Sequence, residues 1–418
     1  MSPPRIGLDA RFILGERGGV EQATLGLATG LSQLTDGDEE YYFLVYAGAE
    51  DWIKPYLSGA CHALSSPNAP HIHQPSTLRP LRSIVRWVWH RVSPILGARS
   101  VLLPRSDNTI ERAQIDLMHF TTQSGFLTNI PSMYQPWDLQ HVHLPQFFTP
   151  RERLARDITY RAFCERAERV IIPSRWGKRD LIDHYDLPAS KIAVIPAAPA
   201  LPITPPTASD CEAVGRQFNL PKEFVLYPAQ TWAHKNHLGL LEALARLRNE
   251  GKGEIPLICT GTLNEFFPTI QRRLRVLQLD RQVKFLGYVS PLVLRCLYQM
   301  CRALIFPTKF EGFGLPLLEA FSVSVPVACS AVTCLPEIAD DAALLFNPDS
   351  PAEIAAALDR LWTDAPLCQR LIERGYAVSA RYSWIQVARM FRAHYRQLLH
   401  RALTTEDREL LLASDFKG

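Results

Sequence analysis

Two carboxylates in the second half of the chain have the surroundings of a site for a sugar or a ribose. Glu311 lies in a loop with two glycines, and Glu319 follows eight residues later. A buried strand is predicted before the loop, at residues 303–306, and a helix is predicted from Leu315 onward. A strand, a glycine loop and a helix start together present backbone N–H groups to an anion. Carboxylates repel phosphate, so we expect amides to meet a phosphate and the two glutamates to accept hydrogen bonds from hydroxyls.

A lysine in the same half has the position expected of a phosphate ligand. Lys235 follows a predicted strand and comes just before a predicted helix, so its charge would add to the positive end of that helix dipole. Lysines are common on any surface, and it is the combination with the Glu311 loop that favours phosphate contact. Gly261 follows the next predicted strand and is expected to line the same crevice.

The first half carries two weaker candidates. Gly18 and Gly19 separate a predicted strand from a predicted helix without a G-x-G-x-x-G pattern, so a ligand-approach loop and a simple turn are equally good interpretations. Asp138, His141 and His143 follow a predicted strand within six residues of one another. Ligands of open α/β sheets lie at the carboxyl ends of strands, which makes this cluster a candidate site, although a lone histidine is more often structural.

Strands and helices alternate along both halves, which predicts an α/β fold with mostly parallel sheets covered on both faces. The predicted strands are 6–10, 41–46, 116–120, 132–135, 169–173, 191–195, 223–228, 255–260, 282–286, 303–306, 326–329 and 343–346. The predicted helices are 20–34, 151–166, 174–185, 237–249, 265–278, 290–300, 315–323, 351–363, 366–379 and 384–399.

A proline-rich stretch from residue 196 to 207 marks a linker, and a length of 418 residues favours two domains. The predicted organisation is an N-terminal domain, a linker, a C-terminal domain and a final helical segment, at 1–196, 197–222, 223–382 and 383–418.

The composition is that of an ordinary soluble globular protein, with 47% hydrophobic and 21% charged residues. A net charge of +3 does not indicate nucleic-acid binding, and no run of 18 apolar residues indicates a spanning helix. The N-terminus leads straight into a predicted strand, without the apolar core of a signal peptide. Nine scattered cysteines, with no Asn-x-Ser/Thr sequon, favour reduced thiols in the cytoplasm.

Residues 71–112 are rich in arginine and histidine, with two tryptophans and several aliphatic residues between them. The part at 79–99 has the pattern of a basic amphipathic helix, which fits either a contact with the membrane surface or a surface helix whose tryptophans pack inward. Asp36-Gly37-Asp38 has the form of an Asp-x-Asp metal site, but its polar neighbours favour a solvated turn. We therefore expect no metal at this turn.

The string EGFGLPLLEA at residues 311–320 matches the E-x7-E signature of the retaining glycosyltransferases of family 4. Other segments resemble that family in order and spacing: Lys235-Asn236-His237, Leu286-Gly287-Tyr288-Val289, Pro326-Val327-Ala328 through Pro336-Glu337, Gly18-Gly19-Val20-Glu21 and Asp138-Leu139-Gln140-His141. The resemblance covers nearly the whole chain.

The resemblance implies a GT-B fold, in which two Rossmann-like domains face one cleft and the C-terminal helix crosses back to the first domain. It also implies a nucleotide-sugar donor, held by the C-terminal domain without a metal. Lys235 would contact the diphosphate, Glu311 the donor sugar and Glu319 the ribose. The amides of Phe313, Gly314 and Leu315 would lie near phosphate and sugar, and Gly19 would approach the diphosphate from the opposite domain.

The chain departs from the family pattern at two positions. Many relatives have an arginine five residues before the lysine, where this chain has Gln230, which brings a hydrogen-bond donor without a charge. Relatives also often have histidine before the Asp-Leu pair, where this chain has Trp137. Trp137 would stack on a sugar face or His141 would take over a polar role. The candidate catalytic residues are therefore Glu311, Lys235, His141 and Asp138.

The resemblance implies transfer of a hexosyl group from a nucleoside diphosphate sugar to a hydroxyl of a glycan or lipid-linked acceptor, with retention. Mannose from GDP-mannose is the leading donor, and cell-surface polysaccharide synthesis by a cytoplasmic enzyme at the inner face of the membrane is the expected context. Two alternatives stay open: another reaction on the same fold, such as epimerisation or phosphorolysis, and a non-catalytic nucleotide-sugar-binding scaffold. The intact pair of glutamates argues against the scaffold.

Overall fold

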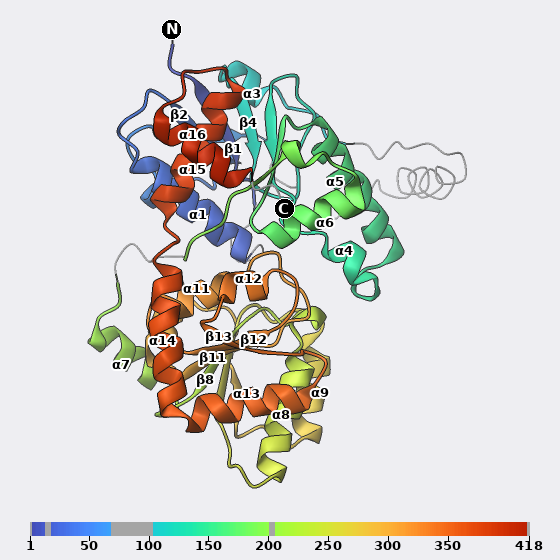
Figure 1. The fold of residues 1–418 in the computed structure, drawn as a ribbon, viewed down its shortest axis with the longest axis vertical. Coiled ribbons are helices and arrows are strands. Elements are labelled where there is room, and N and C mark those ends of the chain that lie inside the picture. The colour runs from blue at the N-terminus through green and yellow to red at the C-terminus, as the bar shows by residue number, and fades with distance from the viewer. Residues whose placement is uncertain (1, 13–17, 68–102, 200–204, 416–418) are drawn as a thin grey trace.

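The computed structural model describes residues 2–12, 18–67, 103–199 and 205–415. The basic segment at 79–99, a candidate for membrane contact, lies outside the described residues. The chain forms two domains that follow one another along the long axis of the molecule (Figure 1). Each domain is a parallel sheet covered by helices, which confirms the predicted α/β fold class with two Rossmann-like domains.

The described part of the N-terminal domain has a parallel sheet in the order β3-β2-β1-β4-β5-β6-β7. Its strands are β1 (Arg5–Asp9), β2 (Glu40–Tyr46), β3 (Cys61–Ser66), β4 (Leu117–Phe120), β5 (Ser132–Tyr134), β6 (Arg169–Ile172) and β7 (Ile192–Val194). Its helices are α1 (Gly19–Ser32), α3 (Thr109–Arg112), α4 (Gln140–His143), α5 (Pro150–Arg166) and α6 (Arg175–Tyr185).

The C-terminal domain has a second parallel sheet, in the order β10-β9-β8-β11-β12-β13. Its strands are β8 (Val225–Pro228), β9 (Leu257–Thr260), β10 (Val283–Phe285), β11 (Ala303–Phe306), β12 (Val327–Ser330) and β13 (Ala343–Phe346). Its helices are α8 (His237–Asn249), α9 (Phe267–Val276), α10 (Pro291–Met300), α11 (Leu315–Phe321), α12 (Leu335–Ala339), α13 (Pro351–Thr363) and α14 (Ala365–Ser379).

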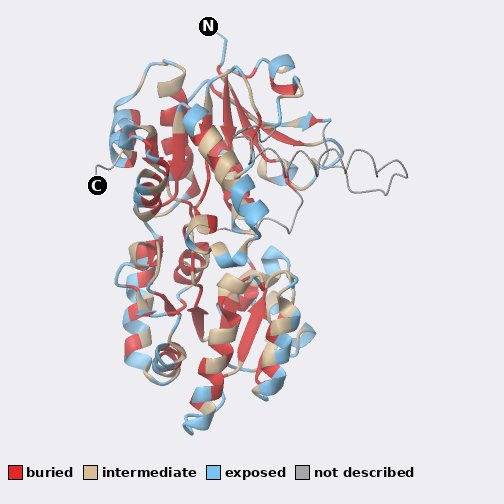
Figure 2. Ribbon diagram, turned by 90° about the vertical axis from the view of Figure 1, so that its right-hand side faces the viewer, coloured by how far each residue is buried: buried red, intermediate tan, exposed pale blue. Residues whose placement is uncertain are grey.

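The central strands are apolar because helices cover both faces of each sheet. All four residues of β11 are buried, and this strand pairs with β8 on one side and β12 on the other. Figure 2 shows the buried strands inside each domain and the exposed residues on the outer faces of the helices. Polar N-caps start several of these helices: Thr149, Ser174 and Ser290 each accept a backbone N–H from the first turn.

The sequence patterns locate most elements to within three residues, but they miss four of the elements just described. These are the edge strand β3 and the short helices α3, α4 and α12. The predicted linker at 197–222 contains another helix, α7 (Ala208–Gln217), which packs against α10 of the C-terminal domain.

The chain returns to the N-terminal domain after α14, as the family resemblance implies. Helix α15 (Trp384–Leu398) packs against α1, and α16 (Thr405–Ser414) packs against α15 (Figure 1). Glycines on α1 make this contact possible, because a Cβ on Gly26 would lie 1.9 Å from the Trp384 ring and one on Gly30 would lie 2.2 Å from the Trp384 carbonyl oxygen. Within the described ranges, no helix combines the length and the apolar character needed to cross a membrane.

Asp36, Gly37 and Asp38 are exposed, as predicted for a solvated turn, and the next residue, Glu39, is a docking point for these last helices. The guanidinium of Arg396 bonds both carboxylate oxygens of Glu39 and also lies 3.0 Å from Asp407. Glu39 is buried, whereas Asp38 is exposed and lies 2.9 Å from Arg401. Buried charges need close partners, so the return of α15 is what allows Glu39 to be buried.

We expect Glu39→Gln to destabilise the folded protein by roughly 2–4 kcal/mol, because it leaves the buried Arg396 with one carboxylate instead of two. The matched change Asp38→Asn removes an exposed charge from the same turn, and its cost should stay within about 1 kcal/mol. Urea-induced unfolding, followed by circular dichroism, measures both. Equal effects of the two substitutions would contradict the buried role of Glu39.

Candidate active site

The candidate residues cluster where the order of the strands reverses in each sheet. In the C-terminal domain, β8 lies between β9 and β11, so the loops that follow β8 and β11 diverge to opposite sides. A crevice for ligands forms at such a point, outside the carboxyl ends of the strands. Lys235 and Glu311 lie in these two loops.

An ion pair between Lys235 and Glu311 joins these two loops. Lys235 Nζ is 2.5 Å from Glu311 Oε1, and the two side chains are only 18% and 13% exposed. Tyr227 fixes the lysine turn by donating its hydroxyl hydrogen bond to the Lys235 carbonyl oxygen. The structure therefore places side by side the cation and the carboxylate that the sequence patterns predict at one site.

Asn236 ties the lysine turn to the rest of the domain. Its backbone is left-handed, with φ of 58°, and its side-chain nitrogen donates to the carbonyl oxygens of Pro307 and Pro348 at 3.0 and 2.8 Å. Asparagine tolerates left-handed backbone better than most residues. One side chain thus joins the loops after β8, β11 and β13, a positioning role that sequence reasoning missed.

Helix α11, which follows the loop after β11, begins at a glycine that has no room for a side chain. Gly314 has φ of 101° and is the N-cap of α11, and a Cβ there would lie 2.6 Å from the Leu335 side chain. Phe313 is buried beside it, and its carbonyl oxygen accepts from the Cys334 thiol. The glycine is therefore needed both for its conformation and for its lack of a side chain.

Glu319 lies on α11 with 8% of its surface exposed. Burial raises the pKa of its carboxyl group, while a hydrogen bond from the Tyr298 hydroxyl and the charge of Arg295 act in the opposite direction. The Tyr298 hydroxyl donates to Glu319 Oε2 at 2.7 Å. One carboxylate oxygen is thus held in place, which orients the other.

The N-terminal domain approaches this site through its first glycine loop. A Cβ on Gly18 would lie 3.4 Å from Gln230 Nε2, and a Cβ on Gly19 would lie 3.7 Å from Leu315 Cδ1. Gly261 packs against the backbone of Ala229 and Gln230, with φ of 118° and only 2.6–2.7 Å for a Cβ. These contacts place Gly18, Gly19, Gln230, Gly261 and Leu315 around one region between the domains.

Asp138 joins the charged pair from the opposite domain. A Cβ on Gly312 would lie 2.7 Å from the Trp137 carbonyl oxygen and 3.3 Å from Asp138 Cβ, so the two domains touch here. Burial is the main cause that raises the pKa of Asp138, and the negative charge of Glu311 adds to it while Lys235 lowers it. Asp138, Glu311 and Lys235 therefore feel one another's charge.

His141 is turned away from this group. Its side chain is 2% exposed, and Nε2 lies 3.3 Å from the Tyr185 hydroxyl and 3.9 Å from Asp157. Burial lowers the pKa of His141 to about 4, so its ring is neutral at pH 7. The side chain contacts α5 and α6 of its own domain, which corresponds to the structural alternative for this histidine.

Trp137 is also turned into its own domain. Its side chain is 9% exposed and donates from Nε1 to the Thr121 carbonyl oxygen at 2.8 Å. The backbone of Trp137 is left-handed, with φ of 69°. The prediction that Trp137 stacks on a sugar face is therefore wrong, because the ring is packed in the core.

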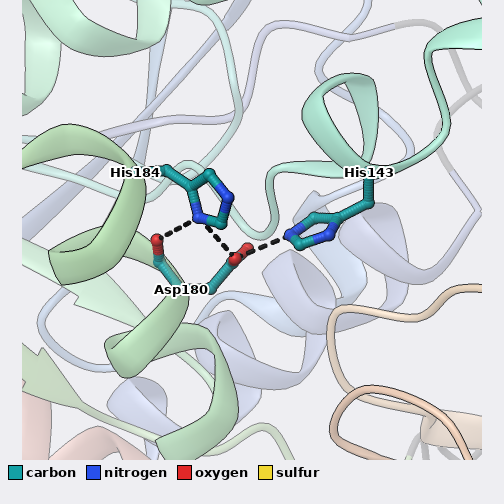
Figure 3. A group of neighbouring side chains, drawn as sticks. All are labelled: His143, Asp180 and His184. Atoms are coloured by element: carbon teal, nitrogen blue, oxygen red, sulfur yellow. Dashed lines mark hydrogen bonds and ion pairs between the residues drawn. The ribbon is translucent and has the colours of Figure 1, made fainter.

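Two histidines share one buried carboxylate beside the site, in an arrangement that sequence reasoning missed (Figure 3). His143 Nε2 and His184 Nδ1 lie 2.6 and 3.0 Å from Asp180 Oδ1. Metal ligands at about 2.0–2.1 Å in a tetrahedron would be separated by roughly 3.3 Å, so these spacings fit hydrogen bonds better than a zinc site. Only the i, i+4 spacing of Asp180 and His184 on a predicted helix could have indicated their contact.

We expect Gly314→Ala to cost more stability than Gly287→Ala. Both glycines have positive φ, of 101° and 71°, but nothing lies within 4 Å of a Cβ on Gly287. Gly287→Ala should therefore cost about 1–2 kcal/mol of backbone strain, and Gly314→Ala should add about 1–3 kcal/mol of steric strain against Leu335. Thermal unfolding of the two variants checks the difference, and equal shifts in Tm would mean that Leu335 moves aside freely.

Comparisons with known proteins agree with this arrangement in both domains. Residues 213–378 match the family model "Glycosyl transferases group 1", and residues 17–198 match "Glycosyltransferase Family 4". The O-antigen chain mannosyltransferase B of Escherichia coli is 30% identical over 223 residues, which are 52% of this chain and 58% of the relative. The serotype-specific mannosyltransferase WbdA of the same species is 26% identical over 298 residues, or 68% of this chain.

The matched stretch spans less than two thirds of each of these relatives, 36% of WbdA and 58% of mannosyltransferase B. A solved glycosyltransferase structure from Rickettsia africae superimposes with a TM-score of 0.66 over 96% of this chain and all of its own, at 15% identity. That likeness bears on the fold, and it agrees with the GT-B arrangement of two Rossmann-like domains. Since one glycosyltransferase model matches each domain, the chain belongs to family 4 of the glycosyltransferases.

Proposed function

We propose that the protein transfers a mannosyl group from GDP-mannose to a hydroxyl of a glycan or lipid-linked acceptor, with retention at the anomeric carbon. The observation that carries this proposal is the Lys235–Glu311 pair at the crevice, facing Gly18, Gly19 and Asp138 of the other domain. The choice of mannose rests on the names of the two relatives from Escherichia coli. Cell-surface polysaccharide synthesis is the context that those names suggest.

In this proposal, the diphosphate of the donor lies between Lys235 and the Gly19 loop. Phosphate then replaces Glu311 as the partner of Lys235, and the freed Glu311 carboxylate accepts hydrogen bonds from the donor sugar. Glu319 receives the ribose hydroxyls through the oxygen that Tyr298 leaves available. The backbone at Phe313, Gly314 and Leu315 lines the same region.

Negative charge develops on the leaving phosphate as the glycosidic bond breaks, so a preorganised cation accelerates the reaction most. Lys235 supplies that charge, and Gln230 adds a hydrogen bond without one. Because the cation is a side chain, we propose that transfer needs no bound metal. The reaction would take place in the cytoplasm, with residues 79–99 as the proposed contact with the inner face of the membrane.

A panel of nucleotide sugars tests the activity. We expect selective release of nucleoside diphosphate from GDP-mannose, and transfer to octyl α-D-mannopyranoside with the anomeric configuration retained, as seen by NMR. Lys235→Ala and Glu311→Gln should each lower kcat by about 10²-fold or more, since each removes a group aimed at the reacting region. Lys309→Ala is the matched control, because Lys309 pairs with Asp349 nearby and should leave kcat within about twofold.

Release from none of the nucleotide sugars, or unchanged turnover in both active-site variants, would refute the proposed function. Formation of free epimer or sugar phosphate instead of a glycoside would favour one of the other reactions on this fold.

Metal independence has its own test. Initial rates measured after dialysis against EDTA should equal those with added Mg²⁺ or Mn²⁺ to within about twofold, because Lys235 provides the cation for the leaving group. A loss of activity on chelation, restored by a divalent ion, would show that the lysine does not suffice.

A further inference from the structure

In the described part of the N-terminal domain, His143 meets the loop after β11 that carries Glu311, here called the donor loop, with a ring that stays partly exposed. Its ring centroid lies 5.3 Å from that of Phe310, which directly precedes Glu311 in the other domain. Phe310 is buried, whereas the His143 side chain keeps 30% of its surface exposed. His143 therefore combines contact with the donor loop and access for a ligand, which His141 lacks.

Asp180 orients the His143 ring from behind. The Asp180 side chain is 4% exposed, and its Oδ1 lies 2.6 Å from His143 Nε2 (Figure 3). A carboxylate at this distance selects the tautomer with the proton on Nε2. The hydrogen-bonding capacity that remains for a ligand is therefore the lone pair of Nδ1.

A histidine ring oriented in this way can bind one hydroxyl group of a ligand. Neutral Nδ1 accepts a hydrogen bond from a hydroxyl, and the partly exposed Trp176, whose ring lies 5.5 Å from that of His143 and packs on the buried Phe310, adds apolar surface. Sugars offer both features, because their hydroxyls alternate with C–H faces that pack against aromatic rings. The ligand class that fits this corner is a glycan.

We propose that Nδ1 of His143, oriented by Asp180, accepts a hydrogen bond from a hydroxyl of the acceptor glycan next to the donor loop. This inference rests on the proposed glycosyl transfer and deepens it by naming an acceptor-binding residue. His143 holds the hydroxyl, and no proton transfer to the ring is involved. Asp180 is a positioning residue, which acts only through His143.

Transfer assays with variants of His143 and Asp180 test this proposal. The donor in these assays is the nucleotide sugar that the wild-type protein hydrolyses fastest in the panel, and the acceptor is octyl α-D-mannopyranoside or octyl α-D-glucopyranoside. His143→Phe keeps a ring against Phe310 and removes Nδ1, so kcat/KM for the acceptor should fall at least about tenfold. Asp180→Asn should lower it several-fold. Donor hydrolysis without an acceptor should stay within about threefold in both variants, which also shows that they fold.

His184→Phe is the matched control. His184 shares the same Asp180 oxygen at 3.0 Å, but it belongs to α6 and is not among the rings packed on Phe310. Its kcat/KM for the acceptor should stay within about twofold of the wild-type value. A fall equal to that of His143→Phe would assign the effect to the shared cluster and overturn the specific role of His143.

The pH profile separates hydroxyl binding from a structural role. The charged or titratable groups around His143 are Asp180 and His184 on α6, and Asp138 before α4, which itself feels Glu311. The hydrogen bond that His143 donates to Asp180 is the largest cause that raises the pKa of His143. Only neutral His143 can accept at Nδ1, so Asp180→Asn should move the acidic limb of kcat/KM for the acceptor to lower pH.

Two results would overturn the inference and leave the proposed function intact. One is wild-type kcat/KM for the acceptor in His143→Phe, and the other is a parallel loss of donor hydrolysis. Donor hydrolysis by the wild-type protein with transfer to neither glycoside would also count against a glycan at this corner. Hydrolysis of no nucleotide sugar by the wild-type protein would instead refute the proposed function itself.

Discussion

The site depends on the buried charge of Lys235, which needs a partner of opposite charge. Lys235 is largely removed from water, and an isolated charge in such a place costs several kcal/mol, so the 2.5 Å contact with Glu311 is a condition for burying either group. Tyr227 and Asn236 hold the lysine turn by its backbone, and Gly314 shapes the loop after Glu311. In the proposed donor complex, a phosphate would give the lysine the same compensation, and the hydroxyls of the donor sugar would be the new hydrogen-bond partners of Glu311.

The same requirement joins the two domains. Glu337 of the C-terminal domain accepts hydrogen bonds from the backbone N–H groups of Arg175 and Trp176 at 2.9 and 3.0 Å, so it caps α6 of the other domain. A carboxylate at a helix N-terminus is favourable because it meets unpaired donors and the positive end of the dipole. The helix that carries Asp180 is therefore fastened to the domain that carries Glu311.

The fold was predictable because short sequence patterns indicate most of its strands and helices. Apolar runs such as 303–306 identify central strands, and the alternation with amphipathic helices requires parallel sheets. Strand β3 was missed because its sequence, Cys61 to Ser66, is half polar, as an edge strand can afford to be. The burial of Glu39 was not predicted, because its partner Arg396 lies 357 residues away and no local pattern reports such a contact.

Site residues could be predicted only where their location follows from the position of a strand or a helix. Motif spacing identified Lys235 and Glu311, because each lies in the loop that follows a central strand. It could not distinguish His141 from His143, since both lie in a four-residue helix whose orientation depends on packing.

The position of Trp137 limits which side chains of its domain can face the loop that carries Glu311. Its left-handed backbone turns the ring inward to the Thr121 carbonyl, so the groups of the described N-terminal domain near Gly312 are the Trp137 carbonyl, Asp138 and the Ser174 hydroxyl, which donates to the Gly312 carbonyl oxygen at 3.4 Å. A side chain that could reach a sugar must then come from farther along the chain. His143 is such a side chain, because its ring packs against Phe310 of the loop that carries Glu311 and stays partly exposed, whereas His141, two residues earlier in α4, is buried against its own domain.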